Sequence, residues 1–219
     1  MKAAGLKSDV ADNLKQAIRS GRYMPNERLI EAELALTFKT NRANIRTALA
    51  RLEQEGLVTH EPNRGARVRL VGDEEALEMT LARGALEKLL ARQAAVVATK
   101  KDHKKLTDLL AAMKSAHKAN DLAKFSQCNT ELHGHIRAMA ANRTVSRMLD
   151  ALLFSIVRLQ YRAILIPGRA DSAMAEHEAI IKAICDSDAE GAEAAMQRHF
   201  DGVLAGLHRA IEFKKSGVL

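Results

Sequence analysis

Hydrophobic residues recur at helical spacing through most of this 219-residue chain, and strand-like alternation occurs in one place only. Periodic runs at 8–20, 31–38 and 42–55 predict three helices. The segments LVTHE and ARVRL then alternate as strands do, on either side of the turn PNRG. Three helices followed by a β-hairpin predict a winged helix-turn-helix.

From residue 73 onward the pattern is helical throughout, with no strand-like alternation and no internal repeat. Polar or Gly/Pro clusters separate the predicted helices, which are 73–98, 102–118, 121–140, 143–164, 172–185 and 188–213. The predicted fold is therefore mainly α, with a winged helix-turn-helix domain at 1–72 and an all-α helical bundle at 73–219.

Charge distinguishes the two parts of the chain, whose net charge is +7. Residues 1–71 hold 13 Lys and Arg against 8 Asp and Glu, whereas residues 72–219 hold 21 against 19. A basic excess in the first third favours a phosphate backbone as partner. A solvated basic face is the alternative, and charge alone does not separate the two.

Other features narrow the class of protein. Cys128 and Cys185 match no metal-binding spacing and fit a reduced protein. No apolar stretch is long enough to span a bilayer, and the N-terminus lacks the apolar core of a signal peptide, so we expect a cytoplasmic location without a membrane partner. The chain shows no nucleophile–base pattern, so we do not expect an enzyme.

The third predicted helix carries the candidate DNA readers. Apolar residues at helical spacing form its core face, and polar residues remain at its exposed N-terminal end; they are Asn41, Arg42, Asn44 and Arg46. This end of a helix-turn-helix enters the major groove, where Arg can bind guanine and Asn adenine. Arg64 and Gly65 form the tip of the wing, where glycine allows close approach to DNA.

Three histidines in the bundle form a candidate metal site. Asn129 and His133 are four residues apart and share one helix face. His177 lies nine residues before Asp186 and His199 eleven after Asp188, so both sit roughly 13–17 Å from the turn of a helical hairpin. The set predicts a divalent metal, with zinc or nickel favoured by imidazole ligands.

Arg83, in the first helix of the bundle, has two interpretations. It can hold the carboxylate of an effector through a bidentate pair. It can also form a salt bridge with Glu87, four residues further along the same helix.

The N-terminal motif resembles the GntR family of bacterial regulators. The matching segments are PNERL at 25–29, NRANIRTALARLEQEGLV at 41–58 and NRGARV at 63–68. By this resemblance, the positions that contact DNA are Arg28, Arg42, Arg46 and Gly65. Asn44 replaces the usual proline of the family, which implies a different operator preference.

The helical part resembles the FCD effector-binding domain of the FadR-type GntR subfamily. The matching segments are RGALE at 83–87, NTELH at 129–133, AANR at 140–143, EHEAIIKAI at 176–184 and MQRHF at 196–200. Many metal-binding FCD domains have Asp where this chain has Asn129, and an amide oxygen is a weaker ligand than a carboxylate.

Together these features predict a homodimeric transcription regulator, in most cases a repressor, that binds a double-stranded DNA operator. A small organic acid held in a metal-containing pocket would control its operator affinity. A metal-independent, acyl-CoA-type sensor, a metal-dependent enzyme fused to a DNA-binding module and a constitutive architectural DNA binder are the alternatives.

Overall fold

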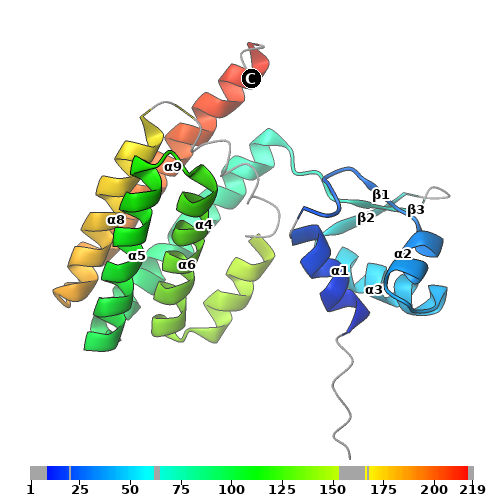
Figure 1. The fold of residues 1–219 in the computed structure, drawn as a ribbon, viewed down its shortest axis with the longest axis horizontal. Helices are drawn as coiled ribbons and strands as arrows, with labels where there is room; N and C mark the ends of the chain where they lie inside the picture. Colours follow the sequence, from blue (N-terminus) through cyan, green and yellow to red (C-terminus); the bar gives the residue numbers. More distant parts are fainter. Residues whose placement is uncertain (1–8, 20, 62–64, 153–165, 167, 217–219) are drawn as a thin grey trace, which may run out of the picture. The chain divides into compact units, whose positions relative to one another are not determined.

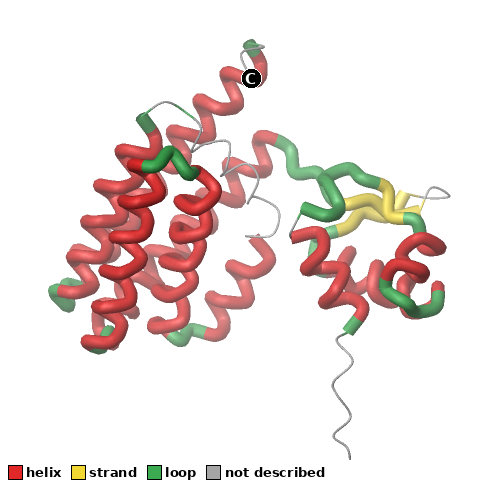
Figure 2. Tube along the Cα trace, in the orientation of Figure 1, coloured by secondary structure: helices red, strands yellow, loops and turns green. Residues whose placement is uncertain are grey.

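The structure, a computed structural model, describes residues 9–19, 21–61, 65–152, 166 and 168–216. The chain divides into two compact units, Met1–Val71 and Gly72–Leu219. Figure 1 shows the order of their helices and strands along the chain. Figure 2 shows that the described strands belong to the first unit, whereas the described part of the second unit is helical.

Three helices build the first unit, as predicted: α1 (Val10–Arg19), α2 (Glu31–Thr37) and α3 (Arg42–Gln54). Their apolar faces meet in a shared core, in which the most buried leucines and isoleucine are Leu14, Leu34, Ile45, Leu49 and Leu52. Because the core holds one face of α3, the other face remains at the surface.

A small sheet completes this unit. β2 (Val58–Glu61) and β3 (Gly65–Val68) pair antiparallel, with Val58 opposite Val68. This pairing confirms the predicted hairpin. Arg64, the predicted wing-tip residue, falls within 62–64 and lies outside the described residues.

A third strand, β1 (Arg28–Leu29), was not predicted and lies on the other side of β3, in the order β1-β3-β2. The hydrophobic pattern predicted no element between the helices at 8–20 and 31–38. Two residues are too few to show alternation, and the pairing depends on contacts with a distant strand. Asn26, with φ of 68°, turns the chain so that its N–H donates to the Val68 carbonyl at 2.9 Å.

The helices of the second unit agree closely with the predicted ranges. They are α4 (Asp73–Val97), α5 (Lys100–Lys118), α6 (Leu122–Ala140), α8 (Arg169–Cys185) and α9 (Ala189–Lys215). Residues 143–152 are also helical, and the rest of the helix predicted at 143–164 lies outside the described residues. Side-chain caps start several of these helices; Thr99 and Asp102 form a reciprocal capping box at the start of α5.

Small residues let the bundle helices pack closely. Ala91, Ala94 and Ala95 of α4 are completely or almost completely buried, and α9 packs along the same helix. Larger side chains, such as Phe125 of α6 and Phe200 of α9, fill the rest of the core. The bundle therefore has a continuous interior in which side chains from α4, α6, α8 and α9 can meet.

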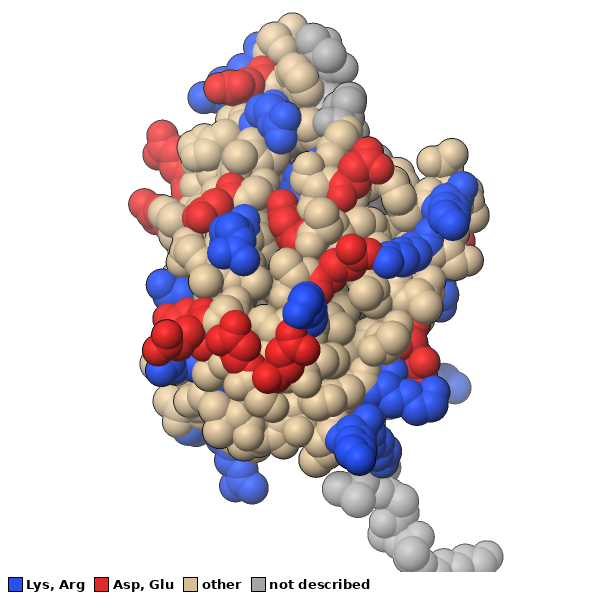
Figure 3. All heavy atoms as spheres, turned by 90° about the vertical axis from the view of Figure 1, so that its left-hand side faces the viewer, with Lys and Arg blue, Asp and Glu red and all other residues tan. Residues whose placement is uncertain are grey.

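The surface shown in Figure 3 carries Lys and Arg interspersed with Asp and Glu over a mostly uncharged background. No helix of the described chain combines the length and apolar character needed to cross a membrane.

Candidate nucleic-acid interface and metal centre

The N-terminal end of α3 presents its predicted polar side chains to solvent. Asn41, Arg42, Asn44 and Arg46 are all exposed. Asn41 is the N-cap of the helix, and its side-chain oxygen accepts a hydrogen bond from the Asn44 N–H at 2.8 Å. Asn44 in turn donates from Nδ2 to Thr40 Oγ1 at 2.9 Å. The two asparagines therefore fix the turn, while Arg42 extends from its first helical position.

Arg46 is tied to the neighbouring helix before any ligand binds. Its Nε donates to both carboxylate oxygens of Glu31, at 3.0 and 2.8 Å. The side chain nevertheless remains 67% exposed. Because the ion pair engages Nε, it aligns the guanidinium and leaves the two terminal amino groups for a second acceptor.

Two arginines lie opposite each other on the small sheet. Arg28 of β1 pairs with Arg67 of β3, and the Arg67 Nη1 donates to the Asn26 carbonyl at 3.0 Å. Like charges at opposed positions repel each other, and an anion between them relieves this repulsion. Sequence reasoning missed Arg67 because it missed β1. Gly65 begins β3 with φ of 83°, a conformation that favours glycine.

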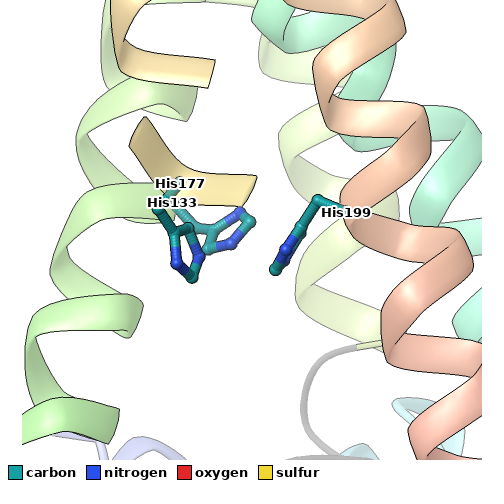
Figure 4. Close-up of side chains that lie close together, drawn as sticks. All are labelled: His133, His177 and His199. Atoms are coloured by element: carbon teal, nitrogen blue, oxygen red, sulfur yellow. The ribbon is translucent and has the colours of Figure 1, made fainter. Parts of the chain in front are cut away.

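In the second unit three histidines from three helices converge. His133 comes from α6, His177 from α8 and His199 from α9, and Figure 4 shows their rings close together. Ring centroids are 4.6 Å apart for His177 and His199, 5.3 Å for His133 and His199, and 5.8 Å for His133 and His177. One ligand atom from each residue lies within 4.8 Å of the other two. The spatial convergence predicted from the hairpin is present.

Several buried polar atoms at this cluster have no hydrogen-bond partner among the described residues. They are both ring nitrogens of His177, Nε2 of His133 and Oδ1 of Asn129. A buried polar atom without a partner costs about 1–3 kcal/mol, so such a group calls for an explanation. A bound metal provides one for Nε2 of His133, for Oδ1 of Asn129 and for one ring nitrogen of His177, because each of these atoms can offer it a lone pair. The residues therefore fit a divalent metal ion.

Glu87 of α4 orients the first histidine, and sequence reasoning considered it only as an ion-pair partner for Arg83. Its Oε2 lies 3.1 Å from Nδ1 of His133, and its Oε1 accepts from Nε of Arg83 at 3.0 Å. Burial by itself raises the pKa of Glu87, but the charges and hydrogen bonds of His133 and Arg83 lower it to about 2. An ionised Glu87 makes Nδ1 of His133 the donor, which leaves the Nε2 lone pair for a metal.

Glu176 of α8 occupies the matching position for His199. It accepts hydrogen bonds from Arg169, Nη1 to Oε1 at 3.0 Å and Nη2 to Oε2 at 2.8 Å, and its Oε2 also lies 2.8 Å from Nδ1 of His199. Burial raises the pKa of Glu176, and Arg169 opposes that rise. Glu176 begins the segment EHEAIIKAI, but the sequence assigned no role to Glu176 or to Arg169. Each of two histidines thus rests against a carboxylate that a buried arginine holds.

Burial keeps the two remaining imidazoles neutral. It lowers the pKa of His177 and of His199 well below the ordinary histidine value, and the neighbouring histidines and Arg169 act in the same direction. A metal binds the neutral form of imidazole, so the apo site is held in the protonation state that a metal requires.

Arg83 is 5% exposed, and its guanidinium carbon lies 5.1 Å from the centroid of the Phe200 ring. The salt bridge with Glu87 is present. Arg83 therefore faces the interior of the bundle and not solvent. Glu87 bridges it to His133, with one carboxylate oxygen at each residue.

Comparison with known families accounts for both units. Residues 6–68 match the family described as bacterial regulatory proteins, gntR family, and residues 78–202 match the FCD domain. The two matches lie within the two units of the structure.

Individual relatives and structures agree with these matches. The chain is 28% identical to the HTH-type transcriptional repressor NanR of Cronobacter sakazakii, over 96% of this chain and 88% of the relative. It is 28% identical to the "Probable D-xylose utilization operon transcriptional repressor" of Paenarthrobacter nicotinovorans, over 88% and 84%. The solved structure of E. coli McbR/YncC has the same fold, with a TM-score of 0.76, 22% identity, and coverage of 91% and 95%. The chain therefore belongs to the GntR family of bacterial regulatory proteins, in the group whose second domain is an FCD domain.

Proposed function

We propose that this protein is a homodimeric transcription regulator, acting as a repressor, whose operator affinity responds to a small organic acid bound at a metal in the helical domain. One observation carries the sensor half of this proposal. His177 is 1% exposed, and no described side chain forms a hydrogen bond with its ring. The backbone of Ala173 is the acceptor that acts on this ring, so one nitrogen can carry the proton toward it and the other keeps a lone pair without a partner among the described residues. A metal ion binds that lone pair, which a purely structural role leaves unsatisfied.

The DNA-binding half rests on the exposed arginines of the first unit. Arg42 and Arg46 would enter the major groove with the N-terminal end of α3. Arg28, Arg67 and the wing residues Arg64 and Gly65 would contact the backbone beside it. Two such units in a dimer would read two half-sites of a near-palindromic operator.

The metal would be held by Asn129, His133, His177 and His199. When bound, a zinc or nickel ion supplies a positive charge that attracts a carboxylate. The surrounding groups do not neutralise this charge, because the Arg83–Glu87 and Arg169–Glu176 pairs are each neutral overall and Asn129 carries no charge. A buried excess of positive charge favours an anionic effector. Arg83 would take part in binding it, because Glu87 contacts both Arg83 and the metal ligand His133.

One relative supports the class of genes controlled. That relative is named for a D-xylose utilization operon, so we propose that this protein also controls genes for the use of a small carbon compound. The small organic acid, bound between α4, α6, α8 and α9, would shift these helices. This shift would change the placement of the two DNA-binding units in the dimer.

The experiment that tests this function selects an operator from random duplex DNA with the purified protein and then measures its affinity in the presence of candidate effectors. Sugar acids, hydroxy acids and dicarboxylates are compared, with the protein either zinc-loaded, nickel-loaded or metal-free. We expect one class of acid to change operator affinity only when metal is present. The same response without metal would point to a metal-independent sensor, and consumption of the acid would point to an enzyme.

Gly202 of α9 provides a test of the carboxylate that supports His199. A Cβ atom at this position would lie 2.5 Å from Oε1 of Glu176 and 3.4 Å from Nη2 of Arg169. Glu176 cannot move away without losing Arg169 or His199, so Gly202→Ala should lower zinc affinity about tenfold to a hundredfold. The affinity is measured by competition with a chromogenic chelator.

Gly134→Ala is the matched control, because it also lies inside a helix and a Cβ there meets nothing within 4 Å. This control should keep its zinc affinity and gain roughly 0.5–1 kcal/mol of stability from the higher helix propensity of alanine. Equal zinc affinities of the two variants would show that Glu176 does not position His199.

A further inference from the structure

An open cleft of about 700 Å³ lies on the second unit, between the C-terminal end of α6 and the helix at 143–152. We call it the arginine cleft, because three of its lining residues are Arg137, Arg143 and Arg147. None of the three is among the residues assigned to DNA or to the metal above. The cleft opens beside the exposed Gly134, whereas the neighbouring His133 is buried.

The charges in the cleft are only partly balanced. Arg137 forms a bidentate ion pair with Asp150, at 2.9 and 2.8 Å. Arg143 and Arg147 are exposed, and the structure shows no ion pair for either within the described residues. They are four residues apart, so they share one face of their helix. Within the part of the chain that the structure describes, the cleft therefore holds two guanidinium groups without an ion-pair partner, beside a third that Asp150 fixes in position.

The backbone adds donors at the same place. Ala141, with φ of 51°, is the left-handed C-cap that ends α6 at the edge of the cleft, and the next helix begins at residue 143. Asn142 caps it, with its side-chain oxygen accepting from the Val145 N–H and its carbonyl from the Ser146 N–H. The N–H groups of Arg143 and Thr144 remain as donors at this end, where the helix dipole favours an anion.

Small residues line part of this open cleft. Gly134, Ala138 and Ala141 line it, and a Cβ built on Gly134 meets nothing within 4 Å. The volume lies within the range of small-molecule sites. A solvated arginine patch needs no such hollow, whereas a ligand that pairs an anionic group with an organic body fills it.

We propose that the arginine cleft binds the phosphate group of a small phosphorylated metabolite. Guanidinium groups bind phosphate oxygens in bidentate fashion, and helix N–H groups are established phosphate donors. The hollow over Gly134 then takes the uncharged body of the ligand. This second site is separate from the imidazole cluster, so it gives the protein an input that does not depend on the metal.

The test is calorimetric titration of the full chain, at physiological salt, with inorganic phosphate, glucose 6-phosphate and uncharged glucose. We expect saturable binding of glucose 6-phosphate and no binding of glucose. R143A/R147A should weaken the binding about tenfold or more. Gly134→Leu keeps every charge but fills the cleft beside residue 134. It should weaken the binding of glucose 6-phosphate more than the binding of inorganic phosphate.

The matched control is K101A/K105A, which removes two exposed charges with the same spacing near the start of α5. This control should bind glucose 6-phosphate as the unchanged protein does. The unchanged protein itself should bind glucose 6-phosphate equally well when metal-free and when zinc-loaded. Equal losses in both double variants, or unchanged binding in Gly134→Leu, would mean diffuse charge instead of a site. Binding that requires zinc would place the phosphate at the metal. If R143A/R147A weakened the binding of duplex DNA but not of glucose 6-phosphate, the cleft would be a contact for the DNA backbone. Each of these results would overturn the proposal.

Discussion

Arg42→Ala and Arg46→Ala should each weaken operator binding about tenfold to a hundredfold, while the protein stays folded. Both side chains are exposed at the N-terminal end of α3, and neither contributes to the core beneath it. A side chain that reads a base contributes about 1–3 kcal/mol of discrimination, which corresponds to this range. Fluorescence anisotropy with a labelled operator measures the effect.

The two variants can be told apart by salt dependence and by sequence preference. If Arg42 contacts phosphate, its loss lowers the slope of log affinity against log salt by about one and weakens all sequences alike. Arg46, which Glu31 aligns through Nε, is the better candidate for a base contact, so its loss should relax preference at one operator position. Glu31→Gln, which retains Arg46 without its ion pair, should cause a smaller loss.

Arg51→Ala is the control on the same helix. Its guanidinium is engaged by Asp9, Asp12 and Glu55, so it stabilises the packing of α1 against α3 instead of facing a ligand. This variant should bind operator within about twofold of the unchanged protein. If Arg42→Ala and Arg46→Ala bind no worse than this control, the assignment of α3 as the reading helix is wrong.

Local patterns predicted the helices because each helix needs only its own periodicity and caps. The ranges of α1, α3 and α4 follow directly from apolar spacing and from Gly or polar residues at their ends. β1 escaped prediction because its two residues become a strand only through pairing with β3, a contact across about forty positions. Arg67 was missed for the same reason.

In the histidine cluster, too, local spacing predicted some features and tertiary packing determined the others. The meeting of His177 and His199 could be predicted because one hairpin places them at equal depth. The roles of Glu87 and Glu176 could not, because glutamates beside arginines are common on helix surfaces. Only the packing of α4 against α6 and of α8 against α9 shows that Glu87, which is buried, and Glu176, which is half-buried, lie beside imidazoles.

The structure favours Asn129 as a metal ligand more than the sequence alone does. As an isolated feature of the sequence, a neutral amide in place of a carboxylate counts against a metal. In the fold its Oδ1 is buried without a partner, and two ionised or arginine-held carboxylates lie behind the histidines. These carboxylates raise the basicity of the imidazoles to which they hydrogen-bond, so Glu87 and Glu176 strengthen two of the histidine ligands beside the weaker ligand Asn129.

The largest effect on the second unit is expected from His177→Ala, which should lower zinc or nickel affinity by about a hundredfold or more. Unlike the other two histidines, His177 has no carboxylate partner in the described structure, so metal coordination is the only role proposed for its ring. Elemental analysis after dialysis should show metal in the unchanged protein and none in the variant.

Thermal unfolding gives an independent measure. A metal present at about a hundred times its Kd stabilises the folded state by roughly 2.7 kcal/mol, which for a chain of this size raises Tm by about 5–10 °C. His177→Ala should lose this metal-induced rise even if the cavity that it leaves also lowers the metal-free Tm. The difference between loaded and metal-free protein therefore isolates coordination from packing.

His208→Ala is the control for this measurement, because His208 lies on α9 with His199 but is exposed. It should retain both its metal content and the rise in Tm. A rise that survives in His177→Ala would place the metal elsewhere in the protein. If the unchanged protein shows no metal-induced rise in Tm, the metal is not part of the function. The acid would then be held directly by Arg83 and the imidazoles, and it would have to provide the hydrogen-bond partners that the ring nitrogens lack.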